Sequence, residues 1–144
     1  MQSQENEVRK ASGQFYAGLN QMANGDAGPL ADIWSQNPDA TTMHPIGGRE
    51  VGWGKVQASF QQVAQVASGG RIILDDQIIR VVGDLAYELG VERGEIKLVG
   101  KQANIDGRVT NIYRREAGNW KIIHHHADIS PAMLEILNQM LTKS

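Results

Sequence analysis

The first half of the chain combines helical patterns with one short extended segment. Apolar residues recur every three or four positions over residues 4–24 and again over 51–67, which predicts two amphipathic helices. Residues 27–34 are expected to form a shorter helix. Residues 41–46 are expected to form a short strand, which the two glycines at 47–48 should end.

The second half of the chain has the shorter period of β-strands. After Gly70, isoleucine and valine become frequent, and apolar positions alternate in part with polar ones. Strands are predicted at residues 71–82, 85–97, 109–115 and 120–127. Residues 98–107 contain two glycines and are expected to form a turn or bulge. Ser130 and Pro131 predict the start of a terminal helix, because serine caps helices and proline is tolerated in the first turn.

The order of these elements predicts the fold class. Strands that follow one another through short loops pair in antiparallel fashion, and the predicted helices precede most of them in the chain. This order is typical of an α+β domain in which helices pack on one face of a curved sheet. The chain has 144 residues, which is the usual size of one domain, so residues 1–144 are expected to form a single domain.

Composition excludes several classes of function. The net charge is −2 with acidic and basic residues mixed along the chain, and no basic stripe is present that would follow a nucleic-acid backbone. The chain has no cysteine, which excludes disulfides, thiolate metal sites and a cysteine nucleophile. The polar N-terminus lacks the apolar segment of a signal peptide, and no apolar run is long enough to cross a membrane. The expectation is a cytoplasmic protein without a membrane or nucleic-acid partner.

Three adjacent histidines in "NWKIIHHHAD" (119–128) are the main chemical feature of the sequence. Because side chains of a strand alternate between its two faces, His124 and His126 should share a face with Trp120 and Ile122. Those two apolar residues suit the core, so His124 and His126 are predicted to face inward and His125 outward. A bulge near the end of the strand would reverse this assignment.

The inward histidines have three interpretations. They are structural imidazoles bonded to their neighbours, or a polar pair in a ligand pocket that moves a proton near neutral pH, or metal ligands. His44 could add a third ligand, and a site of three histidines is chemically reasonable for zinc. No carboxylate can be placed beside them from the sequence, so no metal is expected.

Three stretches resemble one known superfamily. They are "MHPIGGREVGWGKVQASF" (43–60), "LAYELGVERGEI" (85–96) and "VTNIYRREAGNWKIIHHHAD" (109–128). Their order resembles the nuclear transport factor 2-like superfamily, and within it the SnoaL-like branch. The last hairpin is also similar to the association domain of calcium/calmodulin-dependent kinase II. The resemblance covers nearly the whole chain and is specific for the fold.

The resemblance implies a cone, in which a strongly bent antiparallel sheet wraps around the long N-terminal helix as a cystatin-like α+β roll. Its open end would be a pocket, and no cofactor is implied. Superfamily members include ketosteroid isomerase, scytalone dehydratase, limonene epoxide hydrolase, polyketide cyclases and non-enzymatic domains, so the fold does not decide the activity. Members commonly dimerise through the convex sheet face, which predicts a homodimer. Candidates for that face are Ile73, Ile79, Val81 and Ile123.

The pocket of such a cone would be partly apolar and would bind a small organic molecule. Its predicted lining is Trp34, His44, Trp53, Tyr87, Asn111, Tyr113, His124 and His126. An alternative is an enzyme without a cofactor: an isomerase, cyclase, dehydratase or hydrolase. In that case His124 or His126 would be the general acid or base, and Tyr87 or His44 would polarise a carbonyl. A third alternative is an assembly module. No acidic residue can be placed inside the cone from the sequence.

Overall fold

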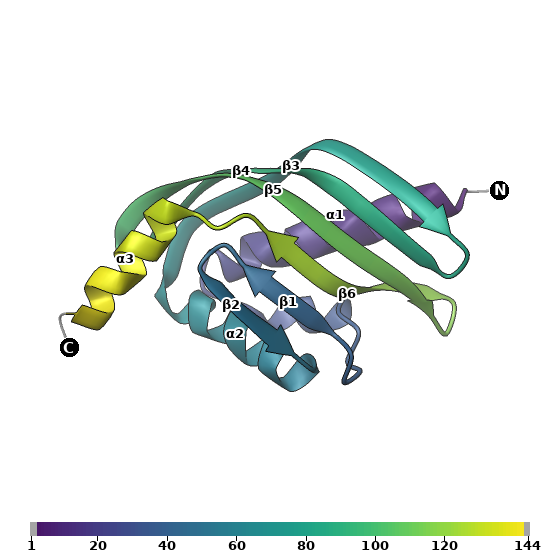
Figure 1. The fold of residues 1–144 in the computed structure, drawn as a ribbon, viewed down its shortest axis with the longest axis horizontal. Helices are drawn as coiled ribbons and strands as arrows, with labels where there is room; N and C mark the ends of the chain where they lie inside the picture. The colour runs from purple at the N-terminus through teal and green to yellow at the C-terminus, as the bar shows by residue number, and fades with distance from the viewer. Residues whose placement is uncertain (1–2, 143–144) are drawn as a thin grey trace.

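The computed structural model describes residues 3–142, with side chains described up to residue 139. A single curved sheet dominates the fold, and its strand order is β2-β1-β6-β5-β4-β3 (Figure 1). The antiparallel part of the sheet comprises β3 (Ala67–Val82), β4 (Leu85–Leu98), β5 (Lys101–Glu116) and β6 (Asn119–Ala127). β1 (Thr41–His44) lies parallel to β6 and antiparallel to β2 (Gly47–Val51).

The helices cover the inner face and one end of this sheet. They are α1 (Gln4–Met22), the 3-10 helix η1 (Gly28–Asp32), α2 (Trp53–Val66) and α3 (Pro131–Thr142). The long strands bend over α1, and α3 lies at the end of the molecule away from the N-terminus (Figure 1). The α+β class and the wrapped N-terminal helix agree with the prediction. No helix within residues 3–142 is long and apolar enough to span a bilayer.

The helix α1 forms because several local signals agree. The Ser3 hydroxyl accepts a hydrogen bond from the Asn6 backbone amide at 3.2 Å, and two glutamates in the first turn suit the positive end of the helix dipole. The apolar stripe from Val8 to Met22 is buried against the sheet, with Phe15 fully enclosed. The helix therefore supplies one wall of the core.

Two loops differ from the sequence prediction. Residues 98–107 do not form a long turn, because only Val99 and Gly100 leave the sheet and both have positive φ angles. The glycines at 47–48 do not end the sheet either. Pro45 and Ile46 form the turn of a tight hairpin, and the two glycines, with φ angles of 91° and 83°, are the first residues of β2 beside β1.

Two β-bulges decide which side chains face inward. In β6, Tyr113 pairs with Ile122 and the preceding Ile112 pairs with His124, so Ile123 is an extra residue. Beyond it the alternation is reversed. In β3 the register shifts between Asp75 and Ile78. Of the four residues predicted for an exposed outer patch, Ile79 is therefore buried, and Val81 packs against the core.

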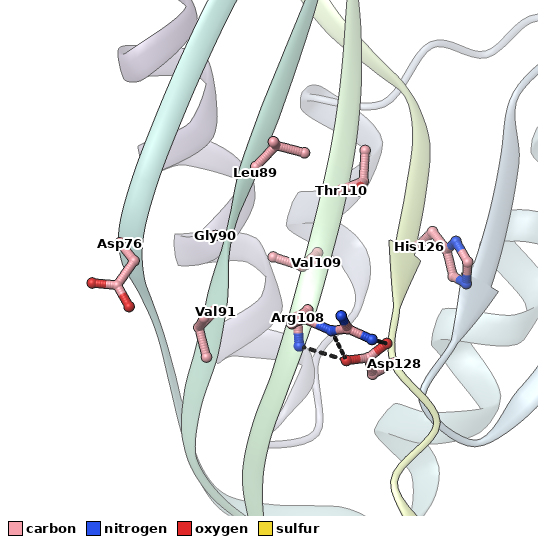
Figure 2. A pocket seen from close by; sticks show the side chains of 9 residues that line it. All are labelled: Asp76, Leu89, Gly90, Val91, Arg108, Val109, Thr110, His126 and Asp128. Atoms are coloured by element: carbon pink, nitrogen blue, oxygen red, sulfur yellow. Dashed lines mark hydrogen bonds and ion pairs between the residues drawn. The ribbon is translucent and has the colours of Figure 1, made fainter.

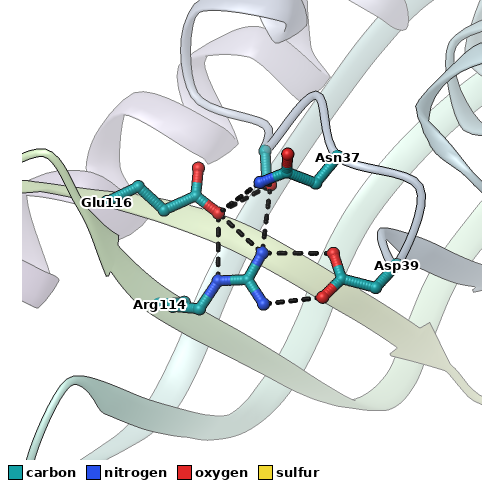
Figure 3. Close-up of polar contacts among 5 residues, drawn as sticks. Asn37, Asp39, Arg114 and Glu116 are labelled. Carbon is teal, nitrogen blue, oxygen red and sulfur yellow. Dashed lines mark hydrogen bonds and ion pairs between the residues drawn. The ribbon is translucent and has the colours of Figure 1, made fainter.

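A cluster of charged groups fastens the chain segment before β1 to the end of β5 (Figure 3). The guanidinium of Arg114 donates hydrogen bonds to both carboxylate oxygens of Asp39, at 2.7 and 3.1 Å, and to Glu116 at 2.7 Å. Ser35 and Asn37 donate to the same Glu116 carboxylate. Hydrogen bonds and charge hold the pKa of Glu116 below its usual range although partial burial opposes this. The cluster thus fixes the segment that leads into β1.

Candidate functional site

Polar side chains form a buried cluster on the inner face of the sheet, where the surroundings are otherwise apolar. The members are Tyr16 of α1, Glu88 and Glu92 of β4, Asn111 and Tyr113 of β5, and His125 of β6. Strand register explains why they meet. Glu88 pairs with Asn111, which in turn pairs with His125, so the three side chains form one row across three strands.

Glu88 is completely buried and surrounded by donors. Its carboxylate accepts hydrogen bonds from Gln77 Nε2 at 2.6 Å, from Tyr113 OH at 2.8 Å and from Asn111 Nδ2 at 2.9 Å. Three donors replace the water that a carboxylate loses on burial. The negative charge of Glu88 therefore has direct partners inside the protein.

Glu92 lies in a different environment from Glu88. Within the described part of the chain, one hydrogen bond reaches its carboxyl, from Tyr16 OH to Oε2 at 2.8 Å. Burial raises the pKa of Glu92 to about 7, the bond from Tyr16 opposes this shift, and the negative charge of Glu88 adds to it. Two neighbouring carboxyl groups with different environments commonly take different roles in proton transfer. Glu92 is the one that can exchange a proton near neutral pH.

His125 stands next to Glu92 and is only 3% exposed. Its Nδ1 lies 2.7 Å from Asn111 Oδ1, and its Nε2 lies 4.0 Å from Glu92 Oε2. Burial, together with the neighbouring His44, places the pKa of His125 well below the ordinary value of 6.5. The ring is therefore neutral at physiological pH and packs edge-on against Phe15.

A small internal cavity touches this pair. Its volume is about 50 Å³, and its polar lining comprises Glu92, His125 and His44. The remaining wall is apolar: Leu19, Met22, Pro45, Ile46, Phe60, Val63, Ile72, Ile96, Ile105 and Met133. A space of this size holds a few waters and is far below the several hundred Å³ of typical ligand pockets.

A larger groove adjoins the cavity at the mouth of the cone. It has a volume of about 370 Å³ and lies between the β1–β2 hairpin, α2 and α3. His44, Ile46 and Val63 line both spaces, so these three side chains separate the groove from Glu92. The His44 ring bonds to Ser59 at 2.8 Å, and burial lowers its pKa to about 4. A neutral histidine therefore stands at the entrance.

The predicted orientation of the histidines is wrong. His125 faces the interior, whereas His124 and His126 lie on the outer face, because the extra residue Ile123 reverses the alternation. His124 Nδ1 bonds to Thr41 Oγ1 at 2.7 Å. Within residues 3–142, no three acidic or histidine side chains come close enough together to hold a metal ion.

Tyr87 and the two tryptophans do not line the internal cavity. Tyr87 is 41% exposed on the outer face, so its predicted pocket position is wrong. Trp34 is buried in the core and stacks on Trp53 with 6.3 Å between ring centroids. Among the other predicted residues, His44 lines the cavity, whereas Asn111 and Tyr113 are buried in the polar cluster and do not line it; their ligand-binding role stays a prediction.

Sequence reasoning missed Glu88, Glu92 and Tyr16. In β4, strand alternation places Glu88 and Glu92 on the face opposite Tyr87 and Leu89. Because Tyr87 was predicted to line the pocket, neither glutamate was placed inside the cone. Gly90 shares their face, and a side chain there would meet Leu74 at 2.5 Å. This crowding is a long-range contact that the sequence does not reveal.

An open trough lies on the opposite, outer face of the sheet (Figure 2). It has a volume of about 450 Å³, and its floor is mainly apolar, with Leu89, Val91 and Val109. The Arg108–Asp128 ion pair, 2.8 Å long, lies at one side. Neither Glu92 nor His125 lines this trough, so it is separate from the interior site.

Comparison with known proteins identifies the family and the fold. A family model described as a SnoaL-like domain matches residues 8–133. A Streptomyces avermitilis structure of the NTF2-like family, provisionally named a dehydratase, has a TM-score of 0.78 and 24% identity. That match covers 90% of this chain and 97% of the other. No curated protein matches the sequence significantly.

Two further solved structures support the same fold. A Thiobacillus denitrificans protein provisionally named a calcium/calmodulin-dependent protein kinase type II association domain has a TM-score of 0.67 and 22% identity, covering 85% of this chain and 94% of its own. A Caulobacter vibrioides protein with a cystatin-like fold has a TM-score of 0.72 and 15% identity, covering 95% and 96%. At these identities the similarities establish the fold alone.

Proposed function

The chain belongs to the SnoaL-like domain family, and on that premise we propose that it binds a small, largely apolar organic molecule and exchanges a proton with it through Glu92. This is chemistry of the isomerase, cyclase or lyase type that requires only side chains of the chain itself. The name of the Streptomyces structure, a dehydratase, is compatible with such chemistry.

The observation that carries the proposal is the position of Glu92. A carboxyl with a pKa of about 7 lies in the wall of a cavity whose other side chains are nearly all apolar. Proton transfer is most efficient when the pKa of the group is close to the working pH. Below pH 7 Glu92 would donate a proton, and above it Glu92 would accept one.

His125 supplies the second polar atom at the same wall. Its Nε2 lies 4.0 Å from Glu92 Oε2, too far for a direct hydrogen bond and close enough for both atoms to face one ligand group. Because burial holds the ring neutral, its free nitrogen can accept a hydrogen bond from a ligand hydroxyl and orient that group toward Glu92.

The dimensions of the site limit the ligand. The internal cavity of about 50 Å³ cannot enclose an organic molecule, so the body of the ligand would occupy the groove of about 370 Å³ at the mouth. A reactive group would reach Glu92 after small movements of Ile46 and Val63. The lining of the groove is mainly apolar but includes Glu50, Ser59 and Gln62, which favours an uncharged ligand with a compact ring or branched hydrocarbon body over an anionic metabolite.

Deuterium exchange tests the proton transfer without knowledge of the natural substrate. A panel of cyclic ketones is incubated with the protein in D2O, and loss of the hydrogens next to the carbonyl is followed by proton NMR. We expect exchange above the buffer rate for at least one ketone. Glu92→Gln should slow that exchange by roughly 100-fold or more, which is the usual contribution of a positioned acid or base.

A matched control separates this effect from a general loss of charge. Glu135 is an exposed glutamate on α3, so Glu135→Gln should exchange like the wild type. The proposal is contradicted if ketones that bind, as seen by NMR line broadening, exchange at the buffer rate. It is equally contradicted if Glu92→Gln leaves the exchange unchanged.

We also propose that two copies of the chain associate through the outer face of the sheet. Ile73, Ile78, Tyr87 and Leu89 are each between 37% and 44% exposed there. Register places Ile78 opposite Leu89 and Arg80 opposite Tyr87, so these side chains share one face. Exposed apolar surface of this kind favours burial against a second copy.

A further inference from the structure

We propose that Glu88 is a positioning residue that acts through Asn111 to hold His125 with its hydrogen on Nδ1 and its lone pair on Nε2. The inference deepens the proposed function and rests on it, because the Nε2 lone pair is the hydrogen-bond acceptor that would orient a ligand beside Glu92. The directions of the hydrogen bonds follow from the structure, and the position of the hydrogen on His125 can be measured without any substrate.

The chain of hydrogen bonds begins at the protein surface. Arginine can only donate, and Arg9 Nη1 lies 2.5 Å from Gln77 Oε1. The Gln77 amide must therefore present its oxygen to Arg9 and its nitrogen to the interior. That nitrogen donates to Glu88 Oε2 at 2.6 Å. The surface arginine thus fixes Gln77 as a donor toward Glu88.

The second oxygen of Glu88 fixes the orientation of Asn111. A carboxylate can only accept, so Asn111 must present its NH2 group to Glu88 Oε1, which lies at 2.9 Å. The same NH2 group donates to Tyr16 OH at 3.1 Å, and Tyr16 in turn donates to Glu92. Turning the amide around would place its oxygen against a carboxylate in a buried site.

The orientation of Asn111 then decides the tautomer of His125. The amide oxygen lies 2.7 Å from Nδ1 and can only accept, so Nδ1 must carry the hydrogen. Since the ring is neutral, Nε2 has a free lone pair, and this atom lies 4.0 Å from Glu92 Oε2. The carboxylate of Glu88 on β4 thus determines, through Asn111, that Nε2 of His125 on β6 is a hydrogen-bond acceptor.

The other tautomer would change the chemistry of the site. Nε2 would then carry a hydrogen directed toward Glu92, and it would stabilise the carboxylate form of that residue. The pair would lose its acceptor, and Glu92 would become a weaker acid–base group near neutral pH. Glu88 touches neither the cavity nor a ligand in the groove, so its effect would be exerted only through Asn111.

The amide variant Glu88→Gln gives a sharp expectation. Because Gln77 still donates, the introduced amide must turn its oxygen toward Gln77 and its NH2 group toward Asn111. Asn111 should then turn around and present its own NH2 group to His125. The expected result is transfer of the ring hydrogen from Nδ1 to Nε2, with the Nδ1 nitrogen resonance moving downfield and that of Nε2 moving upfield.

Long-range proton–nitrogen NMR on the full chain labelled with ¹⁵N-histidine shows directly, at neutral pH, which ring nitrogen of His125 carries the hydrogen. The His125 signals are identified by their absence in His125→Gln. Tyr113→Phe is the matched control, because it removes one donor to Glu88 and leaves the carboxylate, so the hydrogen should stay on Nδ1. The double variant Glu88→Gln/Asn111→Asp restores an obligate acceptor beside His125 and should return the hydrogen to Nδ1.

Each outcome decides the inference. A hydrogen on Nε2 in the wild type overturns the assignment, and a hydrogen that stays on Nδ1 in Glu88→Gln overturns the role of Glu88. Deuterium exchange of a ketone should fall in Glu88→Gln and recover in part in the double variant, which a purely structural role of Glu88 would not produce. If exchange is absent in every variant while the tautomer switches, the proposed function fails and the positioning by Glu88 stands.

Discussion

At the scale of single residues, the two glutamates of β4 show how environment divides one chemical group into two roles. Glu88 accepts three hydrogen bonds, whereas Glu92 accepts one and faces an apolar cavity. The difference arises from cross-strand neighbours. Asn111 and Tyr113 of β5 donate hydrogen bonds to Glu88, whereas among the described residues Tyr16 of α1 is the one hydrogen-bond donor to the carboxyl of Glu92.

Burial of Glu92 also has a consequence for stability. Its pKa rises from 4.5 to about 7 on folding, so the folded protein holds this proton more tightly than the unfolded chain does. The contribution of Glu92 to the free energy of unfolding is therefore largest below pH 4.5 and falls as pH rises to about 7. At about 1.4 kcal/mol per pKa unit, the loss is on the order of 3 kcal/mol.

Urea unfolding of the wild type and Glu92→Gln over this pH range isolates that contribution. The buried histidines His44 and His125 titrate in both proteins, so their effect on stability cancels in the difference. We expect the wild type to lose roughly 3 kcal/mol more than the variant between about pH 4.5 and pH 8. Parallel pH dependences of the two proteins would contradict the raised pKa.

At the scale of the elements, patterns of hydrophobic residues predict the helices and long strands well and the faces of the strands less well. The apolar stripe from Val8 to Met22 identifies α1, although the helix ends at residue 22 and not at the predicted residue 24. A single extra residue in β6 then reverses the histidines. The bulge cannot be predicted from Ile123, because isoleucine occurs at bulged and at regular strand positions alike.

The bulge in β3 has a clearer signal. Asp76 has a φ angle of 56°, and two adjacent aspartates interrupt an otherwise aliphatic strand there. Aspartate tolerates this left-handed conformation better than the β-branched residues around it. The pair of aspartates could therefore have indicated that Ile73 and Ile79 lie on opposite faces, as the structure has them.

The buried acids could not be found from alternation alone. Alternation assigns residues to two faces but does not say which face is covered, and β4 has apolar residues on both. Only the register with β5, together with the approach of α1, decides that Glu88 and Glu92 face inward. Such long-range contacts are set by packing rather than by local sequence.

At the scale of the whole molecule, the curved sheet separates two surfaces with different expected roles. The inner face holds Glu92 and His125, and the outer face exposes a band of apolar residues. Because the two surfaces are on opposite sides of the sheet, association through the outer face would leave the groove at the mouth accessible.

Sedimentation velocity tests this association. We expect the wild type to sediment as a dimer at micromolar concentration and Leu89→Asp to sediment as a monomer, because a charge would be buried at the centre of the contact. Val99 is also an exposed apolar residue, but it lies in the β4–β5 turn, so Val99→Asp should remain dimeric. A monomeric wild type would contradict the proposed dimer and would leave the interior site unaffected.

The central claim is that one buried carboxyl titrates near neutral pH in an apolar cavity. Carbon NMR of protein labelled at the glutamate carboxyl carbon measures this directly, with the Glu92 signal identified by its loss in Glu92→Gln. We expect that signal to titrate with a pKa of about 7, well above the ordinary glutamate value of 4.5. A Glu92 signal that titrates at the ordinary glutamate value would contradict the proposed acid–base site.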